Sequence, residues 1–217
     1  MGLLKNFFSQ TKKPEGFLGK LMVNGMNSGH AKLGDWGMER LPRTEVRQAA
    51  DFGCGGGRNV EKLLERYPEA CVTGADYSEL SVQTSKKHNA DAIAKGRCRI
   101  VRADVSGLKF KPETFDLATA FETIYFWPGL ARCFREIAKV LKEGGYFLAV
   151  NESDGLDPAA KKFEKIIDGM TLYTKEEITA ALEEAGFEII YCEHHPKKPW
   201  LRILARKTGK LKWTKET

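Results

Sequence analysis

The sequence predicts an α/β domain whose sheet is mostly parallel and is covered by helices on both faces. From about Arg47 onward, short apolar segments typical of strands alternate with segments of helical periodicity. The last two predicted strands stand too close together for a crossover helix, so they are expected to pair antiparallel. The length of 217 residues, with 42% hydrophobic and 29% charged residues, fits one globular domain with a small appendage.

Seven segments are expected to form strands, because each is a short apolar run. The first strand leads into a run of glycines, and the second and third strands are each followed by an aspartate. In chain order the segments are 47–52, 70–75, 97–103, 115–121, 146–150, 187–192 and 200–205.

Two helices are expected between the first three strands. The first has apolar residues at positions i, i+3, i+4 and i+7 counted from Val60, and Pro68 ends it. The second has Ser78 as its expected N-cap and runs to about Ala94.

Two more helices are expected after the fourth and fifth strands. One has an apolar face over 130–141 and is expected to stop at Gly144 and Gly145. The other begins with Thr174 and Glu177, which have the spacing of a capping box, and Gly186 ends it.

The chain is expected to divide into three regions. Residues 1–45 show no strand alternation but are rich in apolar and aromatic residues, which predicts a helical lid. Residues 46–206 form the core domain, and residues 207–217 form a basic tail.

The net charge of +6 is unevenly placed and bears on partners and location. Residues 196–217 contain eight Lys or Arg and one acidic residue, whereas the rest contains 27 basic and 28 acidic residues. A basic end can contact nucleic acid or anionic lipid, but a solvated, frayed chain end is the favoured interpretation. The five cysteines form no C-x-x-C pair and fit a reducing cytoplasm. No apolar run approaches the ~18–20 residues of a membrane span, so no membrane partner is expected.

A glycine-rich segment, Asp51-Phe-Gly-Cys-Gly-Gly-Gly57, lies between the first strand and the first helix. Small residues at such a turn allow the backbone to approach a ligand closely. The dinucleotide fingerprint G-x-G-x-x-G would require glycine at position 58, which is Arg58. No G-K-[ST] follows either, so the segment argues against a bound dinucleotide and is not a P-loop.

Two aspartates follow neighbouring strands. Asp76 comes 23 residues after Gly53, where a carboxylate can accept hydrogen bonds from ribose hydroxyls. Asp104 follows the next strand, where a carboxylate can accept a hydrogen bond from an exocyclic amine such as adenine N6. Each aspartate has the alternative role of a helix cap. With the glycine loop they predict a pocket for a nucleoside without its phosphates.

These features together resemble the class I S-adenosylmethionine-dependent methyltransferases, of the small single-domain prokaryotic type. The matching segments are 49–57 (AADFGCGGG), 72–78 (VTGADYS), 101–105 (VRADV) and 115–121 (FDLATAF), and 141–146 (LKEGGY) resembles the turn before the fifth strand. Ala49 and Ala50 depart from the usual bulkier pair, and Glu143 stands where proline is common. The resemblance implies a Rossmann-like, doubly wound, seven-stranded sheet with an antiparallel last strand, and S-adenosylmethionine as cofactor across the ends of strands one to four.

The resemblance also implies which residues surround the cofactor. They are Asp51, Gly53, Gly55 and Gly57 around the methionine moiety, Asp76 at the ribose, Tyr77 against the adenine, Asp104 at the adenine N6 with Val105 beside it, and Phe121 beneath the sulfonium.

Glu122 is the first candidate for a catalytic residue, because it follows the fourth strand at the expected cofactor site. Methyl transfer needs alignment and exclusion of water, and it needs a general base only if the acceptor carries a proton. Glu122 is expected to be that base or a recognition group, with a structural carboxylate as the alternative. Tyr125, Phe126 and Trp127 suit an aromatic wall around a substrate, with simple packing as the alternative.

The predicted lid supplies His30 as a second catalytic candidate and Trp36 as a substrate contact. The alternative is a helical pair packed on the sheet. His194 and His195 stand near a strand end, but no further ligands converge on them in the sequence, so no metal is expected.

The acceptor is expected to be a small molecule. No Asn/Asp-Pro-Pro-Tyr/Phe follows the fourth strand, as it usually does in enzymes that methylate adenine or glutamine amines, and 154–173 leaves little room for a recognition domain. Nucleic acid is disfavoured but remains the second candidate because of the basic tail. A non-catalytic nucleoside-binding protein is the third. The oligomeric state stays open.

Overall fold

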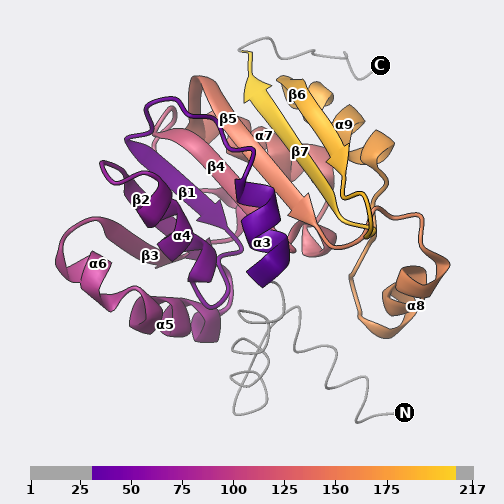
Figure 1. Ribbon diagram of the computed structural model, residues 1–217, viewed down its shortest axis with the longest axis horizontal. Coiled ribbons are helices and arrows are strands. Elements are labelled where there is room, and N and C mark those ends of the chain that lie inside the picture. The colour runs from indigo at the N-terminus through magenta and orange to yellow at the C-terminus, as the bar shows by residue number, and fades with distance from the viewer. Residues whose placement is uncertain (1–30, 209–217) are drawn as a thin grey trace.

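The structure, a computed structural model, describes residues 31–208 and contains one seven-stranded sheet (Figure 1). The strand order is β3-β2-β1-β4-β5-β7-β6. In chain order the strands are β1 (Gln48–Phe52), β2 (Cys71–Asp76), β3 (Cys98–Arg102), β4 (Phe115–Phe121), β5 (Leu141–Asn151), β6 (Phe187–His194) and β7 (Leu201–Lys207). Neighbouring strands from β3 to β5 pair parallel, and β7 pairs antiparallel with both β5 and β6. The predicted fold class is therefore confirmed, including the antiparallel last strand.

Helices cover both faces of the sheet within the described residues. They are α3 (Ala31–Met38), α4 (Arg58–Arg66), α5 (Glu79–His88), α6 (Ala90–Ala94), α7 (Leu130–Val140), α8 (Pro158–Ile166) and α9 (Lys175–Glu184). Two short 3-10 turns, η1 (Val105–Gly107) and η2 (Ile124–Phe126), follow β3 and β4.

Each face of the sheet has its own apolar core. On one face, α3, α4 and α5 pack Leu33, Leu63 and Val82 against side chains such as Val150 of β5. On the other face, α7 and α9 bury residues such as Phe134 and Leu182. Successive strand residues point to opposite faces, so the adjacent Ala49 and Ala50 of β1 belong to different cores.

The predicted lid and core regions meet at α3, which shares its core with the sheet. Gly37 of α3 lies so close to β5 that a Cβ atom there would be 2.6 Å from Val150. The carbonyl of Trp36 accepts a hydrogen bond from Arg202 of β7. The role of residues 1–45 as a lid stays a prediction, since residues 1–30 lie outside the described part of the chain.

The predicted capping box is confirmed at α9. The Thr174 hydroxyl accepts a hydrogen bond from the Glu177 backbone N–H, and the Glu177 carboxylate accepts one from the Thr174 backbone N–H. Ser78 is likewise the N-cap of its helix, where it accepts a hydrogen bond from the Ser81 backbone N–H.

Two predicted helix boundaries are wrong. The helix expected to stop at Gly144 and Gly145 ends at Val140, because Leu141 already pairs with β4. The two glycines fall inside β5, at the bulge that shifts its register against β4. The helix expected over 78–94 is broken at Asn89, which separates α5 from α6.

Helix α8 has no counterpart among the predicted elements. In Figure 1 it lies away from the sheet, in the segment that connects β5 to α9. Leu156 and Phe163 of this connecting segment are 60% and 40% exposed, so these apolar side chains are not buried in the core.

Candidate functional site

A cavity of about 320 Å³ lies at the carboxyl ends of four neighbouring strands, β3, β2, β1 and β4. In α/β sheets ligands bind at this edge, at the point where the strand order reverses. Here β2 and β3 lie on one side of β1, and β4 lies on its other side. Leu33 and Gly34 of α3 complete the wall. The volume suits a small-molecule ligand.

Ten residues predicted from the sequence line this cavity, and they come from distant parts of the chain: Gly53, Gly55, Asp76, Tyr77, Asp104, Val105, Phe121, Glu122, Phe126 and Trp127. Four other predicted residues are outside its described lining: Asp51, Gly57, Trp36 and Tyr125. His30 lies outside the described residues. The ligand or catalytic roles assigned to all of these residues remain predictions.

The three spaced glycines of the loop each have positive φ, but they are required for different reasons. A Cβ atom on Gly53 would lie 2.2 Å from the Thr123 hydroxyl oxygen, so this glycine permits contact between the loop and the end of β4. A Cβ atom on Gly55 would meet nothing within 4 Å, so this glycine faces the open cavity. The loop therefore combines one packing glycine with one that exposes backbone to a ligand.

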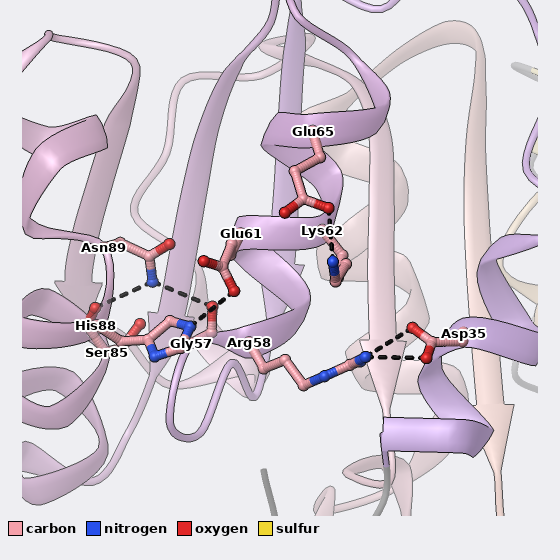
Figure 2. A network of polar contacts seen from close by, with 9 residues as sticks. All are labelled: Asp35, Gly57, Arg58, Glu61, Lys62, Glu65, Ser85, His88 and Asn89. Atoms are coloured by element: carbon pink, nitrogen blue, oxygen red, sulfur yellow. Dashed lines mark hydrogen bonds and ion pairs between the residues drawn. The ribbon is translucent and has the colours of Figure 1, made fainter. Parts of the chain in front are cut away.

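Gly57 packs against α5 and lies outside the described cavity lining. A Cβ atom there would lie 2.5 Å from Asn89 Nδ2 and from Ser85 Oγ. The Asn89 amide donates hydrogen bonds to the carbonyls of Gly57 and Ser85 at 3.1 and 3.0 Å, as Figure 2 shows. The third glycine thus fixes the start of α4 against the end of α5.

Asp76 holds the glycine loop from the neighbouring strand. Its carboxylate accepts hydrogen bonds of 2.9 Å from the backbone N–H groups of Gly55 and Ser78. Burial raises the pKa of this carboxyl, while the N–H groups oppose the rise. Each oxygen accepts one of these bonds, and the Ser81 side chain and the Tyr77 backbone also form hydrogen bonds with this carboxylate.

Asp104 combines both roles that the sequence left open. Its carboxylate accepts hydrogen bonds of 2.8 Å from the backbone N–H and the hydroxyl of Ser106, so it caps η1. It also lines the cavity beside Tyr77 and Val105. A cap and a ligand contact are therefore compatible at this residue.

Asp51 lies beneath the loop, where its side chain is 1% exposed. The Thr119 hydroxyl donates a hydrogen bond of 2.7 Å to it. Burial raises the pKa of Asp51 to about 7, with the Thr119 hydrogen bond opposing and the charge of Asp76 adding to the rise. The carboxyl therefore titrates near neutral pH instead of near pH 4.

Glu122 lines the cavity with a strained backbone. Its φ of 57° is left-handed, which is uncommon for a side-chain-bearing residue and often occurs at functional sites. The backbone N–H of Glu152 and the hydroxyl of Tyr125 donate hydrogen bonds to its carboxylate. Burial raises the pKa of Glu122 to about 8, and the charge of Glu152 adds to the rise.

The aromatic residues after Glu122 differ in whether they line the cavity. Phe126 and Trp127 line the cavity, and the Trp127 indole N–H donates a hydrogen bond of 3.2 Å to the Thr123 hydroxyl. Tyr125 is 4% exposed and accepts a hydrogen bond from the Ser153 backbone N–H. Burial raises the pKa of Tyr125, so its hydroxyl stays protonated and donates to Glu122.

Trp36 packs away from the cavity, against the end of the β6–β7 hairpin. Its ring centroid lies 5.4 Å from that of His195 and 5.9 Å from that of Trp200. The Arg202 guanidinium lies over the same ring at 4.3 Å. These contacts explain the position of Trp36 as an anchor for α3, and its expected contact with a substrate has no support in this geometry.

The residues of the cavity wall that sequence reasoning missed include Leu33, Gly34, Arg58 and Asn59. Arg58 and Asn59 begin α4 directly after the glycine loop, so their position in the chain was a usable signal. Leu33 and Gly34 reach the wall only through the packing of α3, and no local pattern marks them. Figure 2 shows Arg58 extending from α4 to Asp35 on α3.

Two further findings concern metals and membranes. Among residues 31–208, no group of three or more His, Cys, Asp or Glu side chains is arranged to hold a metal ion. The Nδ1 atom of His194 lies 3.6 Å from the Oδ2 atom of Asp154. None of the helices in this part of the chain has the length and apolar character that crossing a bilayer requires.

Comparison with known proteins finds a family model that matches the middle of the chain. The methyltransferase domain family matches residues 50–149. Cycloartenol-C-24-methyltransferase of Arabidopsis thaliana is 30% identical over 156 residues, which cover 67% of this chain and 46% of that protein. Trans-aconitate 2-methyltransferase of Afipia carboxidovorans is 29% identical over 149 residues, covering 69% of this chain and 55% of that protein. The chain thus spans about half the length of these curated relatives.

A solved structure shows the same fold over almost its full length. It is a chain in the complex between the Haloferax volcanii Trm112 methyltransferase activator and a methyltransferase. The likeness has a TM-score of 0.79 at 18% identity and covers 86% of this chain and 94% of that one. The chain is therefore built around a methyltransferase domain of the class I, S-adenosylmethionine-dependent fold.

Proposed function

We propose that this protein binds S-adenosylmethionine and transfers its methyl group to a small-molecule acceptor. The proposal rests mainly on one observation. Gly55, Asp76, Asp104 and Glu122, which stand near the ends of four different strands, line the same cavity. The methyltransferase domain match over residues 50–149 supports the same activity.

The residues present fit the nucleoside part of this cofactor. Asp76 and Asp104 place carboxylates in the cavity wall, and carboxylates are suitable acceptors for ribose hydroxyls and an exocyclic amine. Tyr77 and Val105 line the wall next to them and offer apolar surface for a base. Gly55 has open space where a side chain would stand, so backbone can approach the amino-acid part of the ligand.

When bound, the cofactor supplies an electrophilic methyl group on a sulfonium leaving group. The protein then has to align the acceptor, exclude water and, for an acceptor that carries a proton, remove that proton. Phe126, Trp127 and Leu33 are the apolar residues of the wall that exclude water.

Glu122 is the residue that we assign to proton removal. Its pKa of about 8 lies close to the pH at which an intracellular base would act. A cationic ligand in the cavity would lower this pKa, because an opposite charge favours the carboxylate form. The strained backbone and the donors from Tyr125 and Glu152 hold the carboxylate in one place.

A small molecule is the acceptor class that the chain supports best. The cavity volume of about 320 Å³ leaves little room beside a nucleoside ligand. The two relatives described above are, by their names, methyltransferases of a sterol and of trans-aconitate. The five free cysteines support a reducing, cytoplasmic setting.

The segment before β1 is proposed to close the cavity. Leu33 and Gly34 of α3 already form part of its wall. Deleting residues 1–40 should reduce methyl transfer far more than it reduces cofactor affinity. Wild-type turnover by a folded deletion variant would show that the acceptor is held by the 122–127 side alone.

Titration calorimetry with S-adenosylmethionine and S-adenosylhomocysteine tests the cofactor. Micromolar binding is expected, on the order of −8 kcal/mol. Asp76→Asn should weaken binding about tenfold or more, because the ribose loses a charged acceptor. Asp116→Asn is the matched control, since Asp116 binds the backbone of β1 and Lys142 outside the described cavity lining.

A methyl-release assay then tests the acceptor class against small molecules and RNA. Turnover on RNA that disappears when 209–217 is removed would move the proposal to nucleic acid. Cofactor binding without turnover on any acceptor would favour a nucleoside-binding protein. Tight NADH binding without S-adenosyl binding would refute the proposed function.

A further inference from the structure

Arg58 stands at the α3 end of the cavity. Within the described residues, one terminal nitrogen of its guanidinium, Nη2, forms hydrogen bonds, and the other, Nη1, forms none. Nη2 donates hydrogen bonds of 2.7 and 2.9 Å to the two carboxylate oxygens of Asp35 (Figure 2). Nη1 is buried and has no hydrogen-bond partner. Since a buried donor without a partner is costly, this atom indicates a missing acceptor.

Gly34 of α3 packs closely against the Nη1 side of the guanidinium. A Cβ atom on Gly34 would lie 3.3 Å from Arg58 Nη1 and 2.8 Å from Asn59 Oδ1. Any larger residue would press on both side chains. The absence of a side chain at Gly34 thus lets α3 pack directly on Arg58 and Asn59 where these two residues join the cavity wall.

The charges around the cavity are unequal. Among its described lining residues three carry carboxyl groups, Asp76, Asp104 and Glu122, and Arg58 is the only Lys or Arg. With a pKa of about 8, Glu122 is largely uncharged at neutral pH, so the negative charge lies on the side of Asp76 and Asp104. Asp76 and Asp104 follow β2 and β3, whereas Arg58 follows the loop after β1. A ligand that is cationic overall, with a single carboxylate, matches this distribution.

We infer that Arg58 is the specificity-determining residue for the carboxylate of the cofactor's amino-acid group, which it binds through Nη1 while Nη2 holds α3 through Asp35. The inference rests on the proposed function, because it assumes that the nucleoside end occupies the Asp76 and Asp104 side. Arg58 then selects for the intact amino-acid group and joins α3 to the occupied cavity.

The competing interpretation is that Arg58 only fixes α3 to α4. Asp35 is 55% exposed at its side chain, so the ion pair itself contributes little. The two roles differ in their dependence on the ligand. A structural role affects every ligand alike, whereas a carboxylate-binding role affects only ligands that carry the carboxylate.

The experiment compares S-adenosylhomocysteine with its decarboxylated form, which keeps the amine, by titration calorimetry. Wild-type protein should bind the carboxylated ligand roughly 10- to 100-fold more tightly. Arg58→Gln should reduce this preference to within about threefold, and it should leave the affinity for the decarboxylated ligand almost unchanged. Asp35→Asn is the control, because it breaks the same ion pair but keeps the guanidinium and should keep the preference.

Circular dichroism establishes whether each variant is folded. If Arg58→Gln does not fold, Arg58→Lys replaces it, since lysine keeps the charge but loses the planar donors and should lower the preference several-fold. A preference that survives in these variants, or an equal loss for both ligands, overturns the inference and leaves the proposed function intact. Absence of binding of either ligand to wild-type protein refutes the proposed function and the inference with it.

Discussion

Asp51→Asn should make the stability of the protein less sensitive to a rise in pH from about 4 to about 7. The Asp51 pKa is about 7 in the folded chain, against about 3.9 in an unfolded chain. Between these values the folded state holds a proton that the unfolded state lacks, so unfolding releases it. The free energy of unfolding should therefore fall as pH rises through this range, by about 1.4 kcal/mol per pH unit from this group alone.

The size of the effect follows from the two pKa values. About three units at about 1.4 kcal/mol each give an upper limit of ~4 kcal/mol between pH 4 and pH 8. Asparagine cannot lose this proton, and its amide oxygen can still accept the hydrogen bond from Thr119. Relative to wild type, Asp51→Asn should gain stability steadily toward pH 8.

Urea unfolding at pH 5, 6, 7 and 8 measures the difference between the two proteins. Other titrating groups largely cancel, because both proteins carry them. Asp76→Asn serves as a comparison, since its carboxyl contributes to the Asp51 shift through charge alone. Parallel stability curves for wild type and Asp51→Asn would refute the assignment of a buried, protonated Asp51.

Four further predictions follow from the site and from α9. Gly53→Ala should cost about 2 kcal/mol or more, because its Cβ would lie 2.2 Å from the Thr123 hydroxyl. Gly55→Ala should cost only about 1 kcal/mol of left-handed strain but should weaken cofactor binding, and unfolding and calorimetry separate these outcomes. Glu122→Gln should flatten a kcat/KM profile that rises toward about pH 8 in wild type, and an unchanged profile would exclude Glu122 as the base. Thr174→Ala should lose the capping box and about 1 kcal/mol, which thermal unfolding detects as a lower Tm.

The strands and most of the helices between them could be predicted because their signals are local, whereas the Rossmann-like sheet followed from the family resemblance. Each strand is a short apolar run, and the β7 pairing follows from the short connection before it. The end of α7 could not be placed, because Leu141 continues the helical spacing although it pairs with Phe115 in the sheet. The break at Asn89 depends on its contact with the Gly57 carbonyl, which is far away in the sequence.

The candidate site likewise contains residues that local sequence signals predict and residues that only tertiary packing places. Asp76, Asp104 and Glu122 could be predicted because each directly follows a strand, and parallel strands end at one edge of the sheet. Leu33 and Gly34 could not, since they reach the wall only when α3 packs on β5. The packing of Trp36 could not be predicted for the same reason, because its partners Trp200 and Arg202 stand more than 160 residues later.

The two sides of the cavity differ in how firmly the structure holds them, and this difference predicts where ligands exchange. Glu122 is fixed by its backbone N–H, which donates to the Val150 carbonyl, and by the two donors to its carboxylate. Helix α3 is eight residues long and contains two glycines, so it depends on tertiary packing to remain helical. Hydrogen exchange should therefore be faster in α3 than in β4 and β5, and a cofactor analogue should slow it in α3 most. Equal protection of α3 and β4 in the free protein would show that the α3 side is not the entrance.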